Sequence, residues 1–126
     1  MKKILIIGGT GFIGFNIAKS LQKKLNYVIH IADNLSRGQL DNYMLDLISN
    51  ENVKFIEGDF TIKSSFNLLD NNYDHIYMLA SIVGVNNTME VPDEILRVNS
   101  LLVIQTLDWI KKSNIKKVIY TSTSEN

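Results

Sequence analysis

Glycines are concentrated in one short segment near the start of the chain. Gly8, Gly9, Gly11 and Gly14 directly follow the apolar residues 4–7. Glycine has no Cβ to hold a ligand away, so such a turn can bring backbone N–H groups against a phosphate. A helix that begins at the turn adds the positive end of its dipole. The pattern predicts pyrophosphate binding: Gly8, Gly9 and Gly11 can adopt positive φ angles and lack a Cβ, and Gly14 lets the helix pack close to the sheet. No Lys-Ser/Thr pair follows, which argues against a nucleoside-triphosphate loop.

A carboxylate lies at the spacing expected for a partner of this turn. Asp33 ends the second apolar run, 19 residues after Gly14. It can accept hydrogen bonds from both hydroxyls of a ribose and would repel a 2′-phosphate, which favours NAD over NADP. Two alternatives stay open. Asp33 can instead cap the turn before Asn34, and Arg37 can supply the cation that a 2′-phosphate needs.

Alternating strands and helices must position these residues. Residues 3–7 are almost wholly apolar, which is typical of a parallel strand buried on both faces. Strand-to-helix-to-strand connections are right-handed, so the alternation predicts an α/β fold with a doubly wound, five-stranded parallel sheet of order 3-2-1-4-5 and helices on both faces. The ligand would lie at the carboxyl ends beside the first strand. The expected strands are 3–7, 27–32, 53–56, 75–80 and 118–121, and the expected helices are 12–24, 40–48, 64–69 and 92–112.

The helix expected at 92–112, from Pro92 to Lys112, is apolar on two sides. One side can pack on the sheet, and the other needs a second partner, so we expect a homodimer through this helix. One side is expected to hold Ile95, Val98, Leu102 and Trp109, and the other side Leu96, Val103, Leu107 and Ile110.

The composition excludes several classes of protein. The 126 residues suffice for one domain, and 13 basic residues balance 13 acidic ones, so no nucleic-acid partner is expected. The chain has no cysteine, which excludes disulfides and thiolate metal sites and suits a reducing cytoplasm. No apolar run approaches the ~18 residues of a membrane span. His30 and His75 stand alone in strand-like runs, so we expect no metal site.

Residues 7–14 and 33–38 resemble the extended short-chain dehydrogenases/reductases, in particular the NAD-dependent epimerases and dehydratases that act on nucleotide sugars. The resemblance spans essentially the whole chain. It implies a Rossmann-type fold, NAD as cofactor and a nucleotide sugar as substrate. The implied parent reaction passes through a 4-keto sugar, as in an epimerase, a dehydratase or a decarboxylase.

The resemblance also implies roles for single residues. Asp59 would bind the adenine amino group, although it can also be a helix cap before Thr61. Asn99 would support the site from behind, although it can also face solvent. Met78 stands where many relatives have His. The implied cofactor-binding residues are Gly8, Gly11, Phe12, Ile13, Gly14, Asp33, Asn34, Asp59, Phe60, Leu79, Ala80, Ser81, Asn99 and Thr121.

The last residues resemble the segment that carries catalytic groups in this family. Thr123 would hydrogen-bond the 4-oxygen of the sugar, and Glu125 would take part in proton transfer. The alternative is a hydroxyl-rich strand end without a catalytic role. None of the five tyrosines has a lysine four residues later, so the Tyr-x-x-x-Lys pair of the family is missing. We therefore expect an NAD-binding domain at 1–126 that is the N-terminal portion of a longer enzyme and inactive alone. A dinucleotide-sensing module without turnover and a fragment that binds little remain alternatives.

Overall fold

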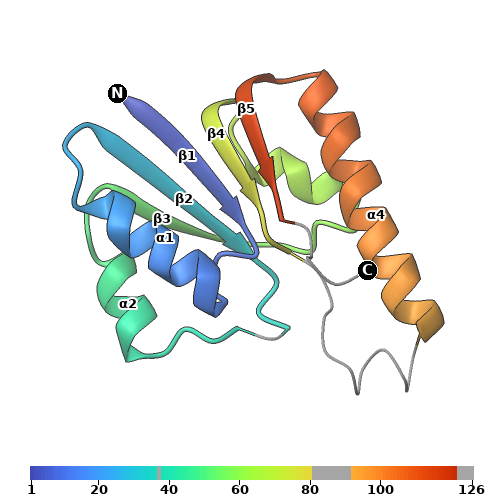
Figure 1. Ribbon diagram of the computed structural model, residues 1–126, viewed down its shortest axis with the longest axis horizontal. Helices are drawn as coiled ribbons and strands as arrows, with labels where there is room; N and C mark the ends of the chain where they lie inside the picture. Colours follow the sequence, from blue (N-terminus) through green and yellow to red (C-terminus); the bar gives the residue numbers. More distant parts are fainter. Residues whose placement is uncertain (37, 81–91, 122–126) are drawn as a thin grey trace.

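The computed structural model describes residues 1–36, 38–80 and 92–121. Five parallel strands form one sheet of order β3-β2-β1-β4-β5, which confirms the predicted topology. Helices α1 and α2 lie on one side of the sheet, and α4 lies on the other (Figure 1). The elements are β1 (Lys2–Ile7), α1 (Phe12–Gln22), β2 (Tyr27–Asp33), α2 (Asn42–Ile48), β3 (Val53–Glu57), the 3₁₀ helix η1 (Lys63–Leu68), β4 (Asn72–Met78), α4 (Pro92–Lys111) and β5 (Asn114–Tyr120).

Strand β1 is buried on both faces, as its continuous apolar run predicts. Its residues Ile4 to Ile7 are all 0% exposed, and successive side chains point to opposite faces. Ile4 and Ile6 belong to the core layer under α1 and α2. Leu5 and Ile7 belong to the second layer, which η1 and α4 cover. The carboxyl end of β1 is therefore fixed from both sides.

Strands β4 and β5 begin earlier than the sequence predicts, at residue 72 rather than 75 and at 114 rather than 118. Polar residues made these segments resemble loops. Asn72 pairs with Asn114 across the two strands. The carboxylate of Asp74 accepts a hydrogen bond from the backbone N–H of Lys3 at 2.7 Å and forms an ion pair with Lys116 at 2.9 Å. The other predicted boundaries lie within two residues of those in the structure.

Helix α4 places more of its surface on the sheet than the sequence predicts. Leu102 and Thr106 are buried, and Ile110 packs against the same core as Trp109. The expectation that Ile110 lies on a different side of the helix from Trp109 is therefore wrong. It follows Trp109 directly, and the apolar stripe that faces a core is wide enough to include both. Leu96 and Leu107 remain exposed, at 70% and 52%.

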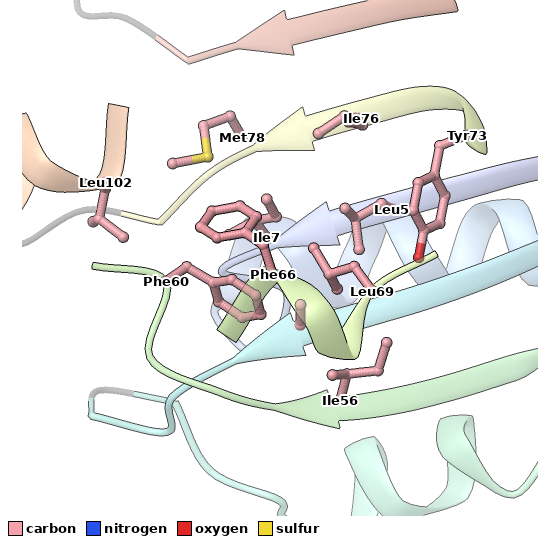
Figure 2. Packing of buried hydrophobic residues seen from close by; sticks show 11 residues of the cluster. Leu5, Ile7, Ile56, Phe60, Phe66, Leu69, Tyr73, Ile76, Met78 and Leu102 are labelled. Atoms are coloured by element: carbon pink, nitrogen blue, oxygen red, sulfur yellow. The ribbon is translucent and has the colours of Figure 1, made fainter. Parts of the chain in front are cut away.

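Contacts between aromatic rings connect η1 to α4 and to the segment that follows β3. The ring of Phe66 lies 5.1 Å from that of Phe60 and 5.4 Å from that of Trp109. Figure 2 shows Phe60 and Phe66 on the side from which Leu102 of α4 approaches. Such contacts hold the segment between β3 and β4 against the sheet. Among the helices that the structure describes, none has the length and apolar character needed to cross a membrane.

Replacing Phe66 by leucine is expected to lower the free energy of unfolding by about 1 kcal/mol, because the ring contacts are lost while most of the buried volume is kept. Urea titration measures this change. Tyr43→Leu is the control, because Tyr43 is 75% exposed, and its effect should stay within about 0.5 kcal/mol. Equal effects of the two substitutions would contradict a structural role for the aromatic cluster.

Candidate functional site

A cleft of about 610 Å³ lies at the carboxyl ends of the central strands. Its walls come from the turn between β1 and α1, the end of β2, the segment after β3, the end of β4 and one side of α4. In a parallel sheet this is the position at which the strand order reverses and ligands bind. The cleft therefore lies where the sequence predicts the site.

Three glycines make the turn between β1 and α1 compact. Gly8 has a φ of 83°, and a Cβ there would lie 2.6 Å from the backbone nitrogen of Ala80. A Cβ on Gly9 would lie 2.6 Å from Cγ2 of Ile31, and one on Gly14 would lie 2.5 Å from Cα of Gly9. Among the described glycines, Gly8 is the one that uses the freedom to adopt a positive φ. Gly9 is required by packing.

Gly11 leaves open space at the floor of the cleft. It precedes α1 with φ of −74° and ψ of 175°, and a Cβ there would have its nearest contact 3.8 Å away. The start of α1 has neither a side-chain cap nor an acidic residue in its first turn. The first N–H groups of a helix lack intrahelical acceptors, and Phe12, Ile13 and Gly14 all line the cleft. The start of α1 therefore suits a pyrophosphate.

The carboxylate of Asp33 is held in a fixed orientation at the end of β2. One oxygen accepts a hydrogen bond from the backbone N–H of Thr10 at 3.0 Å, and the other accepts one from Leu35 at 2.9 Å. The second bond is the turn cap expected as an alternative. Each carboxylate oxygen can accept a further hydrogen bond, and Asp33 lines the cleft. The two roles of Asp33 are therefore compatible.

Gly58, Phe60 and Thr61 form the wall beyond β3. Phe60 is 3% exposed and lines the cleft. The carboxylate of Asp59 accepts hydrogen bonds from the backbone N–H of Thr61 at 3.0 Å and from its hydroxyl at 2.6 Å. These bonds close a turn and do not cap a helix as the alternative expected, because η1 begins at Lys63 after Ile62 and has no side-chain cap. The expected contact of Asp59 with adenine stays a prediction.

The opposite wall is fixed to β1 and β4. The N–H of Leu79 donates to the carbonyl of Ile7 at 2.8 Å, and the hydroxyl of Thr121 donates to the carbonyl of Met78 at 3.2 Å. The side chain of Met78 is buried against Thr106, with 3.8 Å between the sulfur and the hydroxyl oxygen. Met78 therefore has a packing role.

Most of the residues predicted from the sequence come together in the cleft. Asp59 and Asn99 do not line it, and Ser81, Thr123 and Glu125 lie outside the described residues, as does Arg37. The predicted residues that line the cleft are Gly8, Gly11, Phe12, Ile13, Gly14, Asp33, Asn34, Phe60, Leu79, Ala80 and Thr121.

Sequence reasoning missed part of the wall. Val98 and Leu102 line the cleft from α4, and both belong to one of the two apolar sides expected for this helix. Their spacing was a usable signal, because residues four apart share a helix face. Ser36, Gly38, Gly58 and Thr61 also line the cleft. In the three described stretches of chain, no three His, Asp or Glu side chains gather as metal ligands.

Comparison with protein families gives one match over nearly the whole chain. Residues 4–126 match the family described as "NAD dependent epimerase/dehydratase family". The chain is 36% identical over 124 residues to a UDP-N-acetyl-alpha-D-glucosaminuronate decarboxylase of Bacillus cytotoxicus. That match covers 98% of this chain and 37% of the relative. A dTDP-D-glucose 4,6-dehydratase of Dictyostelium discoideum is 32% identical and is covered over 30% of its length.

Comparison with solved structures also gives nucleotide-sugar enzymes that this chain matches over part of their length. The UDP-Glc/GlcNAc 4-epimerase of Campylobacter jejuni superimposes with a TM-score of 0.88 at 27% identity, over 98% of this chain and 38% of that one. The UDP-glucose 4-epimerase of Bifidobacterium longum, solved with NAD⁺ and UDP, has a TM-score of 0.85 at 25% identity, over 98% and 37%. The chain thus spans less than two-fifths of the length of these relatives.

Proposed function

Because this chain belongs to the NAD-dependent epimerase/dehydratase family, we propose that it is the NAD-binding part of an enzyme that converts one nucleotide sugar into another. The observation that carries the proposal is the cleft, where a glycine turn, the start of α1 and a fixed carboxylate lie together at the carboxyl ends of the strands. The cofactor of the family is NAD, and its nicotinamide ring accepts and returns a hydride when it is bound.

The residues of the cleft have separate tasks in this proposal. The free N–H groups at the start of α1 receive the pyrophosphate, because Gly11 leaves space there. Asp33 accepts the ribose hydroxyls on the lone pairs that Thr10 and Leu35 do not use. Phe60 and Leu102 supply apolar walls that exclude water from the adenine ring.

The sugar chemistry is the finer part of the proposal. Oxidation at C4 of the sugar gives a 4-keto intermediate, which is then epimerised, dehydrated or decarboxylated. Thr123 would hold the 4-oxygen and Glu125 would move a proton. The decarboxylase and dehydratase among the relatives support this class of reaction for the parent protein.

The remaining parts of the proposal concern the whole protein. The 126 residues would form the cofactor-binding domain and be inactive alone, because the chain spans 37% of its decarboxylase relative and holds no Tyr-x-x-x-Lys pair. A homodimer would use the exposed side of α4, where Leu96 lies. The absence of cysteine supports a cytoplasmic location.

Titration of the purified chain with each dinucleotide tests cofactor binding. Calorimetry is expected to show NAD bound about tenfold more tightly than NADP, because a 2′-phosphate would meet the negative charge of Asp33. Equal or tighter binding of NADP would contradict the assignment, and no heat with millimolar NAD would contradict cofactor binding by this chain.

A sensing module remains the second candidate, favoured by the missing Tyr-x-x-x-Lys pair. Sequencing the complete reading frame separates the two functions. A Tyr-x-x-x-Lys pair encoded downstream supports the enzyme, and its absence supports the sensor.

A further inference from the structure

A buried histidine bridges two strands at the amino end of the sheet, opposite the cleft. His30 on β2 is 6% exposed, and its Nδ1 lies 2.8 Å from the hydroxyl of Tyr73 on β4. The two rings meet edge to face, with 5.5 Å between their centres. Strands β2 and β4 lie on either side of β1, so this bond passes across β1. Figure 2 shows the Tyr73 ring at the amino end of β4, with its hydroxyl directed away from that strand.

The hydrogen bonds at Tyr73 determine which ring nitrogen of His30 carries the hydrogen. The backbone N–H of Asp70 donates to the Tyr73 hydroxyl oxygen at 3.2 Å. The hydroxyl hydrogen then has Nδ1 of His30 as its acceptor, so this nitrogen is unprotonated and the ring carries its hydrogen on Nε2. A proton on Nδ1 would reverse the bond and leave the hydroxyl hydrogen of a residue that is 2% exposed without an acceptor. The pair is therefore satisfied when His30 is neutral.

The charges around the pair come from every neighbouring strand. Lys3 on β1 forms an ion pair with Asp70, and its ammonium lies 5.4 Å from the centre of the Tyr73 ring. Lys54 on β3 is the register partner of His30. Asp74, Lys116 and the first residue, Met1, line the same hollow of the surface as His30.

Burial lowers the pKa of His30 from its ordinary value of 6.5; the carboxylate of Asp70 opposes this shift, and Lys3 and Lys54 add to it. Lys3 lowers the pKa of Asp70, and burial raises that of Tyr73. Asp70 and Tyr73 therefore keep their charge states at mildly acidic and neutral pH, so His30 is the member of this group that acid protonates.

The sign of the pH effect follows from the lowered value. The unfolded chain binds a proton at its histidine near pH 6.5, whereas the folded chain binds it only at lower pH. The stabilisation is therefore fully present above pH 6.5 and is lost as the pH falls below it.

The pair also holds a defined segment in place. Asp70 lies in the short connection between η1 and β4, and Tyr73 is the second residue of β4. The hydrogen bonds from Asp70 to Tyr73 and between Tyr73 and His30 therefore hold this connection against the sheet. We propose that His30 and Tyr73 form a pH-sensitive latch that closes this connection at neutral pH and releases it in acid. The latch does not depend on the proposed cofactor or substrate.

Three measurements on the full chain test the latch. Long-range ¹H–¹⁵N spectra should show His30 with its hydrogen on Nε2 at pH 7.5 and with a pKa below 6.5. The Asp70 amide should exchange with solvent more readily at pH 5 than at pH 7, after correction for intrinsic rates. The unfolding constant should rise by up to tenfold per pH unit below pH 6.5.

Substitutions separate His30 from other acid-sensitive groups. His30→Gln should flatten the pH dependence, because glutamine can accept the Tyr73 hydroxyl but does not titrate. His75→Gln is the control, because it removes the other histidine of the chain. The unfolding constant of this variant should keep the pH dependence of the wild type. If His30→Gln does not fold, Tyr73→Phe in a His75→Gln background serves instead and should move the His30 pKa toward 6.5. An Nδ1–H form at pH 7.5, a His30 pKa of 6.5 or above, or an unchanged slope in His30→Gln would overturn the latch.

Discussion

Replacing Gly14 by valine is expected to lower the free energy of unfolding by about 3 kcal/mol, at the upper end of the cost of overpacking. A Cβ at this position would lie 2.5 Å from Cα of Gly9 and 2.8 Å from its carbonyl carbon. Both atoms belong to backbone that cannot rotate away, and Gly9 is itself closed in by Ile31. The start of α1 must therefore move away from the turn. Urea titration followed by circular dichroism measures the loss.

Gly11→Val is the matched control, because the same side chain is added three residues earlier. The backbone there is extended, and the added Cβ would have its nearest contact at 3.8 Å. We expect a loss of less than about 1 kcal/mol, mainly from a poorer helix start. Gly11→Val should nevertheless prevent NAD binding, because its side chain would fill the floor of the cleft. Equal stability of the two variants would contradict the close packing of Gly14 on Gly9.

Replacing Asp33 by asparagine is expected to weaken NAD binding about 30-fold. Hydrogen bonds to a charged acceptor contribute about 2 kcal/mol, and the amide provides one acceptor oxygen where the carboxylate has two. One of the bonds from Thr10 and Leu35 must also be lost, so the remaining oxygen is less well oriented. Calorimetry with NAD measures the change in affinity.

Asp41→Asn is the control for this substitution. Asp41 makes a similar local bond, accepting the N–H of Met44 at 2.9 Å at the start of α2, but it does not line the cleft. Its affinity for NAD should stay within about twofold of the wild type, since an asparagine caps a helix as well as an aspartate does. If Asp33→Asn bound NAD as tightly as Asp41→Asn, the ribose role of Asp33 would be wrong.

The parts of the fold that the sequence predicts are those set by local patterns. The apolar residues 4–7, the glycine turn and the position of Asp33 are each visible within one segment, and the strand order follows from right-handed crossovers. The reason for glycine at each position of the turn is not visible in the sequence: Gly8 adopts a positive φ, Gly9 is closed in by Ile31, and Gly11 leaves space beside the start of α1.

The parts that the sequence does not predict depend on contacts between distant residues. The early starts of β4 and β5 rest on the pairing of Asn72 with Asn114. The place of Val98 in the cleft wall requires α4 to be docked on the sheet. The hydrogen bond between His30 and Tyr73 joins residues that are 43 positions apart in the chain, and no local sequence pattern predicts it.

The two core layers differ in when synthesis can complete them. All eight buried members of the layer under α1 and α2 lie within residues 4–53. The opposite layer extends to Leu102, and β1 pairs with β4 only after more than 70 further residues have been made. During synthesis, the face under α1 and α2 therefore receives all its buried residues first, while the opposite face, which carries Leu5 and Ile7, stays uncovered for longer. Until η1 and then α4 emerge, that uncovered face is the surface on which a chaperone can act.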